Sequence, residues 1–153
     1  MSINCCEKLI GILRGFERVE CFEKKTSAEE KDKKFLIENK SNKNICRVKI
    51  DNCFINSLEE IKCDYMFAVL DTHDYLLVEL KGRSGISHAI DQINNTYRIV
   101  NNLLKLHESC FKGYIVATCV PAVNQRNRNI IEQRRRQSEI RIEISSRVKK
   151  LTI

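Results

Sequence analysis

Two short runs of strand-forming residues, separated by a polar turn, occupy residues 64–81 of the sequence. The runs DYMFAVL and YLLVELK are rich in β-branched and aromatic residues, and the four residues between them, DTHD, are typical of turns. We expect two antiparallel strands, over 64–70 and 75–81, joined in a hairpin. Because an isolated hairpin is at best marginally stable in water, other elements of the chain must extend and cover it.

The segments that follow alternate between helical and strand periodicity. Apolar residues from Ile86 to Leu104 recur at steps of three and four, which predicts an amphipathic helix. The run GYIVATCV at 113–120 predicts a buried strand, 125–137 a basic helix, and IRIEIS at 140–145 another strand. This interleaving predicts an α/β (α+β) fold with a mixed central β-sheet flanked by helices.

The patterns before residue 64 are less regular. Ser27 and Glu30 have the spacing of a capping box, which predicts a short charged helix. The runs KFLIE at 34–38 and ICRVKI at 45–50 predict a β-hairpin. For LIGILRGF at 9–16, helix and strand both remain open.

A chain of 153 residues with 42% apolar and 31% charged residues fits one ordered domain, which we expect to span 1–153. The start, MSINCCEKLI, lacks the pattern of a secretory signal, and no apolar run approaches the ~20 residues of a transmembrane helix. We therefore expect a cytoplasmic protein that is not bound to membranes.

Eight cysteines stand at 5, 6, 21, 46, 53, 63, 110 and 119, without C-x-x-C pairs or zinc-finger spacing. Disulfides are rare in cytoplasmic proteins. The preferred interpretation is that most of these cysteines are buried thiols that act as small hydrophobes.

The formal charge of +7 favours polyanionic partners. Residues 121–153 hold nine Lys or Arg against three acids and so contribute +6 of this charge. A phosphate-contacting surface and a merely solvated helix are equally favoured for the basic residues Arg126, Arg128, Arg134, Arg135 and Arg136.

The predicted hairpin brings three charged residues together. Its turn sets Leu70 opposite Tyr75, and the pairing then places Asp64 opposite Lys81. Because side chains alternate between the faces of a strand, Glu79 lies on the same face, with diagonal neighbours roughly 7 Å apart. The opposite face is uniformly apolar, and we expect it to pack on a helix.

Two neighbouring carboxylates repel one another unless a cation lies between them, and their hard oxygen atoms suit Mg²⁺ or Mn²⁺. Such a metal lowers the pKa of a bound water, and Lys81 is placed to orient that water or to stabilise developing negative charge. This chemistry is hydrolysis of phosphodiesters. The alternative is a solvated cross-strand salt bridge without function.

These residues resemble the PD-(D/E)XK nuclease superfamily, in which an Asp on one strand is followed, after a variable hairpin, by Glu-x-Lys on the next. The resemblance covers residues 64–102 and includes Gln92, which is similar to a glutamine of RecB-like and Holliday-junction-resolvase-like members. It implies a restriction-endonuclease-like core in which Asp64, Glu79 and the Leu80 carbonyl bind the metal. Lys81 would then be the catalytic lysine, and Gln92 a positioning residue.

The sequence also departs from the family pattern. Cys63 stands where the family often has Pro, Tyr97 misses the Gln-x-x-x-Tyr spacing by one residue, and the family's N-terminal helix with its Glu has no clear counterpart. Asp51, Glu59 and Glu60 all remain open as the further acidic ligand.

The resemblance implies a metal-dependent DNA endonuclease, in repair, restriction or defence against foreign DNA. RNA stays open as a substrate, as do a homodimer and a larger defence or mobile-element complex. The alternatives are a catalytically inactive nucleic-acid-binding module and a protein-interaction subunit.

Overall fold

The computed structural model describes residues 4–82, 85–105, 110–118 and 125–153, with residues 16 and 125–127 described by their backbone alone. The helices are α1 (Cys5–Leu13), α2 (Ile86–Leu104) and α3 (Gln125–Arg136), with a 3-10 segment η1 (Phe16–Cys21). The strands are β1 (Phe22–Glu23), β2 (Ser27–Glu30), β3 (Lys33–Glu38), β4 (Ile45–Lys49), β5 (Tyr65–Val69), β6 (Asp74–Lys81), β7 (Phe111–Ala117), β8 (Arg141–Ser146) and β9 (Val148–Thr152).

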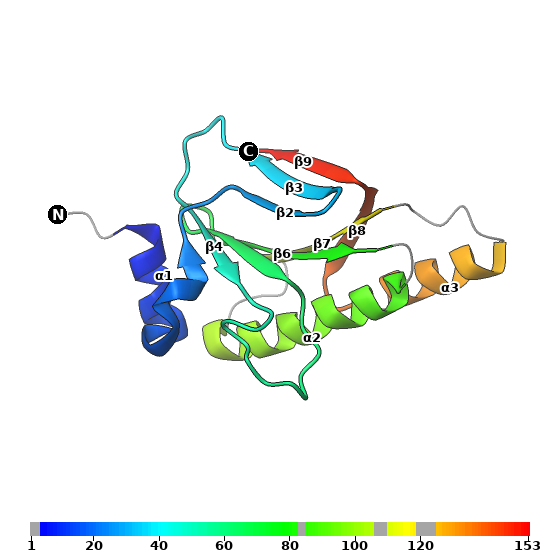
Figure 1. The fold of residues 1–153 in the computed structure, drawn as a ribbon, viewed down its shortest axis with the longest axis horizontal. Helices are drawn as coiled ribbons and strands as arrows, with labels where there is room; N and C mark the ends of the chain where they lie inside the picture. Colours follow the sequence, from blue (N-terminus) through cyan, green and yellow to red (C-terminus); the bar gives the residue numbers. More distant parts are fainter. Residues whose placement is uncertain (1–3, 83–84, 106–109, 119–124) are drawn as a thin grey trace.

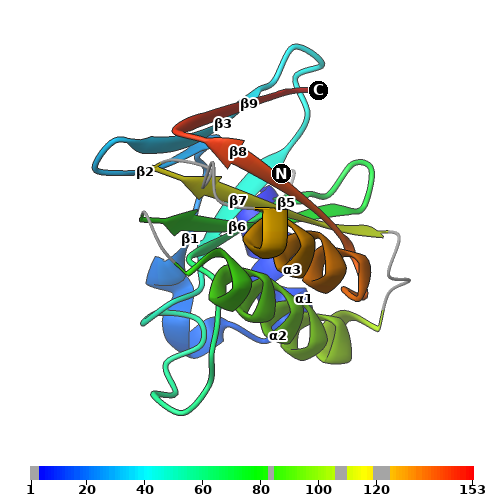
Figure 2. The same ribbon diagram turned by 90° about the vertical axis from the view of Figure 1, so that its right-hand side faces the viewer.

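The described elements form three layers. A six-stranded sheet has the order β1-β4-β5-β6-β7-β8, antiparallel from β1 to β6 and parallel from β6 to β8. The helices lie on one side of it, and the three-stranded sheet β2-β3-β9 lies on the other (Figures 1 and 2). The predicted α/β (α+β) fold with a mixed sheet and flanking helices is confirmed.

Both faces of β5 and β6 are buried, which explains their nearly continuous apolar sequences. Met66 belongs to the core shared with Ile93 of α2. On the other face, the ring of Phe67 lies 5.4 Å from that of Phe35 in β3. The prediction that this second face packs on a helix is therefore wrong. The helices instead cover the face that carries Asp64. Because both faces of the hairpin are apolar, its sequence alone does not specify which face packs on the helices.

The hairpin of β5 and β6 forms, but its register differs from the predicted one. Ala68 pairs with Tyr75, where the sequence analysis placed Leu70, so the strands are shifted by two residues. A shift of two keeps every side chain on its predicted face. Extended by one residue beyond the pair of Tyr65 with Val78, this register sets Asp64 level with Glu79 rather than with Lys81.

The structure corrects two predictions for the N-terminal third. Residues 27–30 form β2 rather than a capped helix, because they pair with β3. The predicted hairpin of 34–38 with 45–50 does not form: β3 pairs with β2 and β9, whereas β4 pairs with β1 and β5. For residues 9–16, where the sequence left helix and strand open, the structure shows a helix that ends at Leu13.

Disulfides join Cys6 to Cys46 and Cys21 to Cys53. The interpretation of the cysteines as free thiols is wrong for these four, because the fold brings together partners that are 40 and 32 residues apart. It holds for Cys5 and Cys63, which are buried and free. None of the helices in the described part of the chain is long and apolar enough to cross a membrane.

Candidate active site

Asp64 is tied to the neighbouring strand through its side chain. The Leu80 backbone amide donates a hydrogen bond of 2.9 Å to Asp64 Oδ2. Since β5 begins only at Tyr65, this carboxylate accepts from an amide of β6 beyond the end of the paired strand. Asp64 is thereby held beside the backbone that carries Glu79 and Lys81.

The Glu79 side chain is buried within this arrangement, with 4% of its surface exposed. Its Oε2 atom is buried and lacks a hydrogen-bond partner among the described residues. Burial, reinforced by the charge of Asp64, raises the pKa of Glu79 to about 9, although the Lys81 ammonium lowers it. A buried unsatisfied acceptor costs about 1–3 kcal/mol, so this oxygen favours a proton or a cation beside it.

Asp64 titrates at a lower pH than Glu79. Burial raises the pKa of Asp64 to about 6, while the hydrogen bond from Leu80 lowers it. At neutral pH the pair therefore carries a mostly charged Asp64 and a protonated Glu79. Two carboxylates with separated pKa values are typical of functional sites.

Lys81 is held by the helix that follows it. Its Nζ donates to Gln92 Oε1 at 3.3 Å, and Gln92 Nε2 donates to the Lys62 carbonyl at 2.9 Å. Gln92 therefore bridges the end of β6 and the segment that leads into β5. The structure brings all four predicted site residues, Asp64, Glu79, Lys81 and Gln92, into one region.

Gly85 allows the Lys81 side chain to pass over the start of α2. Gly85 has φ 88°, in the left-handed region that favours glycine. A Cβ at this position would lie 2.9 Å from Lys81 Cε. The backbone conformation therefore favours glycine, and a side chain here would force the end of the Lys81 side chain to move.

Lys62 is a buried lysine that the sequence analysis missed. Its Nζ donates to the carbonyls of Ser57 and Glu60, the latter at 3.1 Å, and lies 3.8 Å from Asp51 Oδ1. These contacts hold the segment 51–62 together, while the Lys62 carbonyl accepts from Gln92. A single lysine in a polar loop produces no sequence pattern, so nothing in the sequence could have identified it.

Of the three acids left open as a further ligand, only Asp51 has a charge that acts on both Asp64 and Glu79 in the described part of the chain. The charge of Asp51 raises the pKa of both Asp64 and Glu79. Glu60 instead accepts a hydrogen bond of 3.0 Å from Asn95 on α2. The Glu59 carboxylate makes no hydrogen bond or ion pair within the described part of the chain.

Two other acids, Glu30 and Glu7, lie in the N-terminal part of the chain, where the family pattern has a helix with a glutamate. Glu30 of β2, which the sequence analysis assigned to a helix, also raises the pKa of Asp64 from the second sheet. Glu7 of α1 accepts from the Asn4 amide at 3.2 Å and completes a capping box. Glu7 therefore stabilises its own helix, and no contact connects it with Asp64 or Glu79 among the described residues.

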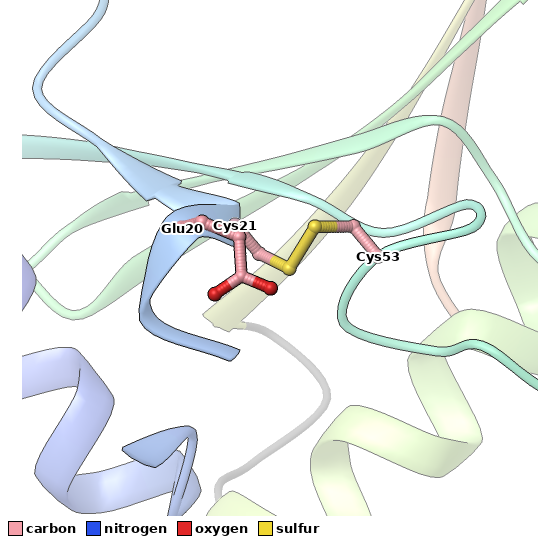
Figure 3. Close-up of side chains that lie close together, drawn as sticks. All are labelled: Glu20, Cys21 and Cys53. Carbon is pink, nitrogen blue, oxygen red and sulfur yellow. A yellow bond between two sulfur atoms is a disulfide. The ribbon is translucent and has the colours of Figure 1, made fainter. Parts of the chain in front are cut away.

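A separate group of candidate metal ligands lies at the end of η1. One ligand atom each of Glu20, Cys21 and Cys53 lies within 4.8 Å of the others. Figure 3 shows that the two sulfur atoms are bonded to each other, so neither is available as a thiolate. This group is a disulfide beside a carboxylate rather than a metal site.

Asp64 and Glu79 fit a hard divalent cation better. They offer carboxylate oxygens, one of which is buried without a partner, and the adjacent Leu80 contributes a backbone carbonyl as a further potential oxygen ligand. Mg²⁺ and Mn²⁺ prefer such ligands.

Four of the five predicted basic residues of α3 divide into two groups. Arg134 pairs with Asp91 of α2 at 2.8 Å and Arg135 with Glu132 at 2.9 Å, which reduces their availability to a ligand. Arg128 and Arg136 are exposed, and no ion pair involves them in the part of the chain that the structure describes. The side chain of Arg126 lies outside the described residues.

In comparisons with known proteins, no family model, no curated protein and no solved structure matches this chain. The resemblance to the PD-(D/E)XK superfamily gains no support from them.

Proposed function

We propose that the protein is a metal-dependent nuclease that hydrolyses phosphodiester bonds, with DNA as its substrate. The observation that carries this proposal is the buried, unpartnered Oε2 of Glu79 next to a second carboxylate, Asp64, with Lys81 at the same strand end. A simple solvated salt bridge would leave neither acid buried, and it would leave neither pKa raised.

Asp64, Glu79 and the Leu80 carbonyl would hold Mg²⁺ or Mn²⁺, which supplies charge neutralisation and a water of lowered pKa. Glu79 must lose its proton for this role, because a protonated carboxyl is a poor ligand. Lys81, oriented by Gln92, places a positive charge where the phosphodiester gains negative charge. Lys62 and Asp51 form an ion pair within the loop 51–62, and the Lys62 carbonyl of this loop accepts the hydrogen bond that positions Gln92.

The C-terminal excess of positive charge supports a polyanionic substrate. Arg128 and Arg136, exposed on α3, are the residues of that helix best placed to contact phosphates. We extend the proposal to repair, restriction or defence against foreign DNA, with a homodimer or a larger complex as the working assembly.

Cleavage of supercoiled plasmid, branched DNA and single-stranded DNA tests the proposal, with Mg²⁺, Mn²⁺ or EDTA. We expect metal-dependent cleavage that falls roughly 100-fold or more in Asp64→Asn and Lys81→Met. Glu29→Gln, at an exposed acid of β2, is the matched control and should cleave like the wild type. Equal cleavage by all four proteins would contradict the site. Salt-sensitive DNA binding without any cleavage would select the inactive binding module.

A further inference from the structure

Two cations lie side by side on the parallel strands β7 and β8. Lys112 and Arg141 are register partners, and both side chains are exposed. The same register places them on the face of the sheet that Leu76 and Tyr114 share with the second sheet. Within the described ranges, neither cation has an ion pair. Like charges on neighbouring strands repel one another, so an anion bound between them would stabilise this arrangement.

The two cations border a hollow of about 170 Å³, which Gly113, Tyr114 and Glu143 also line. Tyr114 is 5% exposed and forms part of the core between the two sheets. The buried Tyr114 and the strand backbone thus form the floor of the hollow, and the two exposed cations form its rim.

Glu143 is the acid that lines this hollow, and it is already engaged. Its Oε1 pairs with Lys149 Nζ of β9 at 2.7 Å. Asp74 also acts on the hollow, since its charge raises the pKa of Tyr114, but its carboxylate accepts a hydrogen bond of 2.6 Å from Thr72. The charges of Lys112 and Arg141 thus exceed the negative charge around them.

We propose that this hollow binds a phosphate group through Lys112 and Arg141. A guanidinium offers a planar pair of N–H donors, an ammonium adds a compact charge, and a phenol can donate a further hydrogen bond, which together suit a tetrahedral oxyanion. Bound phosphate would neutralise the opposed cations. The site would accept a phosphate monoester, on a nucleotide or at a strand end, or a phosphodiester of nucleic acid.

The hollow is separate from the candidate active site. Lys112 lies near the start of β7, whereas Ala117, the partner of Lys81, lies five residues further along, which is about 16 Å. Lys112 also faces the second sheet, whereas Met66, on the same face as Asp64, packs with the helices. The phosphate bound here is therefore not the one under attack, and the inference stands independently of the nuclease proposal.

Titration of ¹⁵N-labelled protein with inorganic phosphate, at constant ionic strength and without divalent metal, tests the site. We expect saturable shifts of the Gly113 and Tyr114 amides, and an affinity at least tenfold weaker in Lys112→Ala and in Arg141→Ala. Lys150→Ala, an exposed lysine of β9 that pairs with Glu38, is the matched control. Absent or non-saturable shifts, or equal affinity in all four proteins, would overturn the proposal.

A second arm distinguishes the sources of the phosphate. A nucleoside monophosphate, and an oligonucleotide with and without a 5′-phosphate, are titrated in the same way. If the nucleoside monophosphate and the 5′-phosphorylated strand bind more tightly than the strand without a 5′-phosphate, the hollow is assigned to a phosphate monoester. Equal binding of both strands that is lost in Lys112→Ala assigns it to the phosphodiester backbone. Shifts elsewhere in the protein, with Gly113 unaffected, would contradict a phosphate site here.

Discussion

The Leu80 amide donates to the Asp64 carboxylate at 2.9 Å, although the two residues belong to different strands of the central sheet. This contact fixes one acid against the backbone between Glu79 and Lys81. The separation of the charged groups is thus set by the sheet rather than by flexible side chains. Such backbone positioning is what a preorganised site requires.

The pH dependence of stability should report the Glu79 proton. Its pKa is raised from 4.5 to about 9, so the native state keeps a proton that the unfolded chain releases between these values. This stabilisation is complete below the unfolded pKa and is lost as the pH rises through the folded one, by about 1.4 kcal/mol per pH unit. Urea unfolding between pH 6.5 and 8.5, without metal, should therefore give a falling stability for the wild type. The free energy of unfolding of Glu79→Gln should be nearly independent of pH in this range. Identical pH dependence in the two proteins would contradict a buried protonated Glu79.

Binding of Mg²⁺ should release a proton near neutral pH, because the cation replaces the proton of Glu79. Calorimetric titrations at pH 7.5, in buffers of different ionisation enthalpy, measure the number of protons released. We expect about one for the wild type and none for Glu79→Gln, whose amide carries no titratable proton. Release of no proton by the wild type on saturation would argue against metal binding at this acid.

Lys62→Met should weaken catalysis without abolishing metal binding. The substitution leaves the carbonyls of Ser57 and Glu60 without the ammonium, at a cost of about 1–3 kcal/mol, and loosens the loop that holds Gln92. We expect the turnover number to fall roughly tenfold and the metal affinity to remain close to that of the wild type. Lys49→Met, at an exposed lysine of β4, is the control for charge alone. Equal kinetics of the two variants would show that Lys62 has no positioning role.

Gly85→Ala should be destabilising, whereas Gly82→Ala should be tolerated. Alanine at 85 adopts a left-handed backbone at a cost of about 1–2 kcal/mol, and its Cβ meets Lys81 Cε. At Gly82, no atom lies within 4 Å of the added Cβ, and the backbone φ lies outside the left-handed region. Thermal denaturation of the two variants compares them directly. A lower melting temperature for Gly82→Ala than for Gly85→Ala would contradict the described turn.

Reduction should destabilise the protein through its N-terminal segment. The disulfides close loops of 40 and 32 residues, and the chain-entropy argument gives about 4 kcal/mol for each. Urea unfolding with and without dithiothreitol measures the loss, and the variant Cys5→Ser, at a free cysteine, is the control. Peptide mapping that failed to link Cys6 with Cys46 and Cys21 with Cys53 would contradict the pairing.

Local patterns in the sequence determined most elements from residue 64 onward. Runs of strand-forming residues on either side of a polar turn predicted β5 and β6, a continuous apolar run predicted β7, alternation with period two predicted β8, and the apolar stripe predicted α2. These patterns depend only on neighbours within one element or one turn. The common face of Asp64, Glu79 and Lys81 also followed, since a register shift of an even number of residues preserves faces.

Tertiary structure decided the features that need distant partners. The second sheet forms because β3 pairs with β9, so that Lys34 meets Val148 across most of the chain length. The second sheet covers one face of the central sheet, and the helices pack on the other, which carries Asp64. Long-range contacts also fixed the hairpin register, the disulfides and the buried position of Lys62. The burial of Glu79 also results from tertiary packing, since its side chain lies on the face of β6 that the helices cover. A strand sequence specifies which side chains share a face, but the elements that cover that face are supplied by remote segments of the chain.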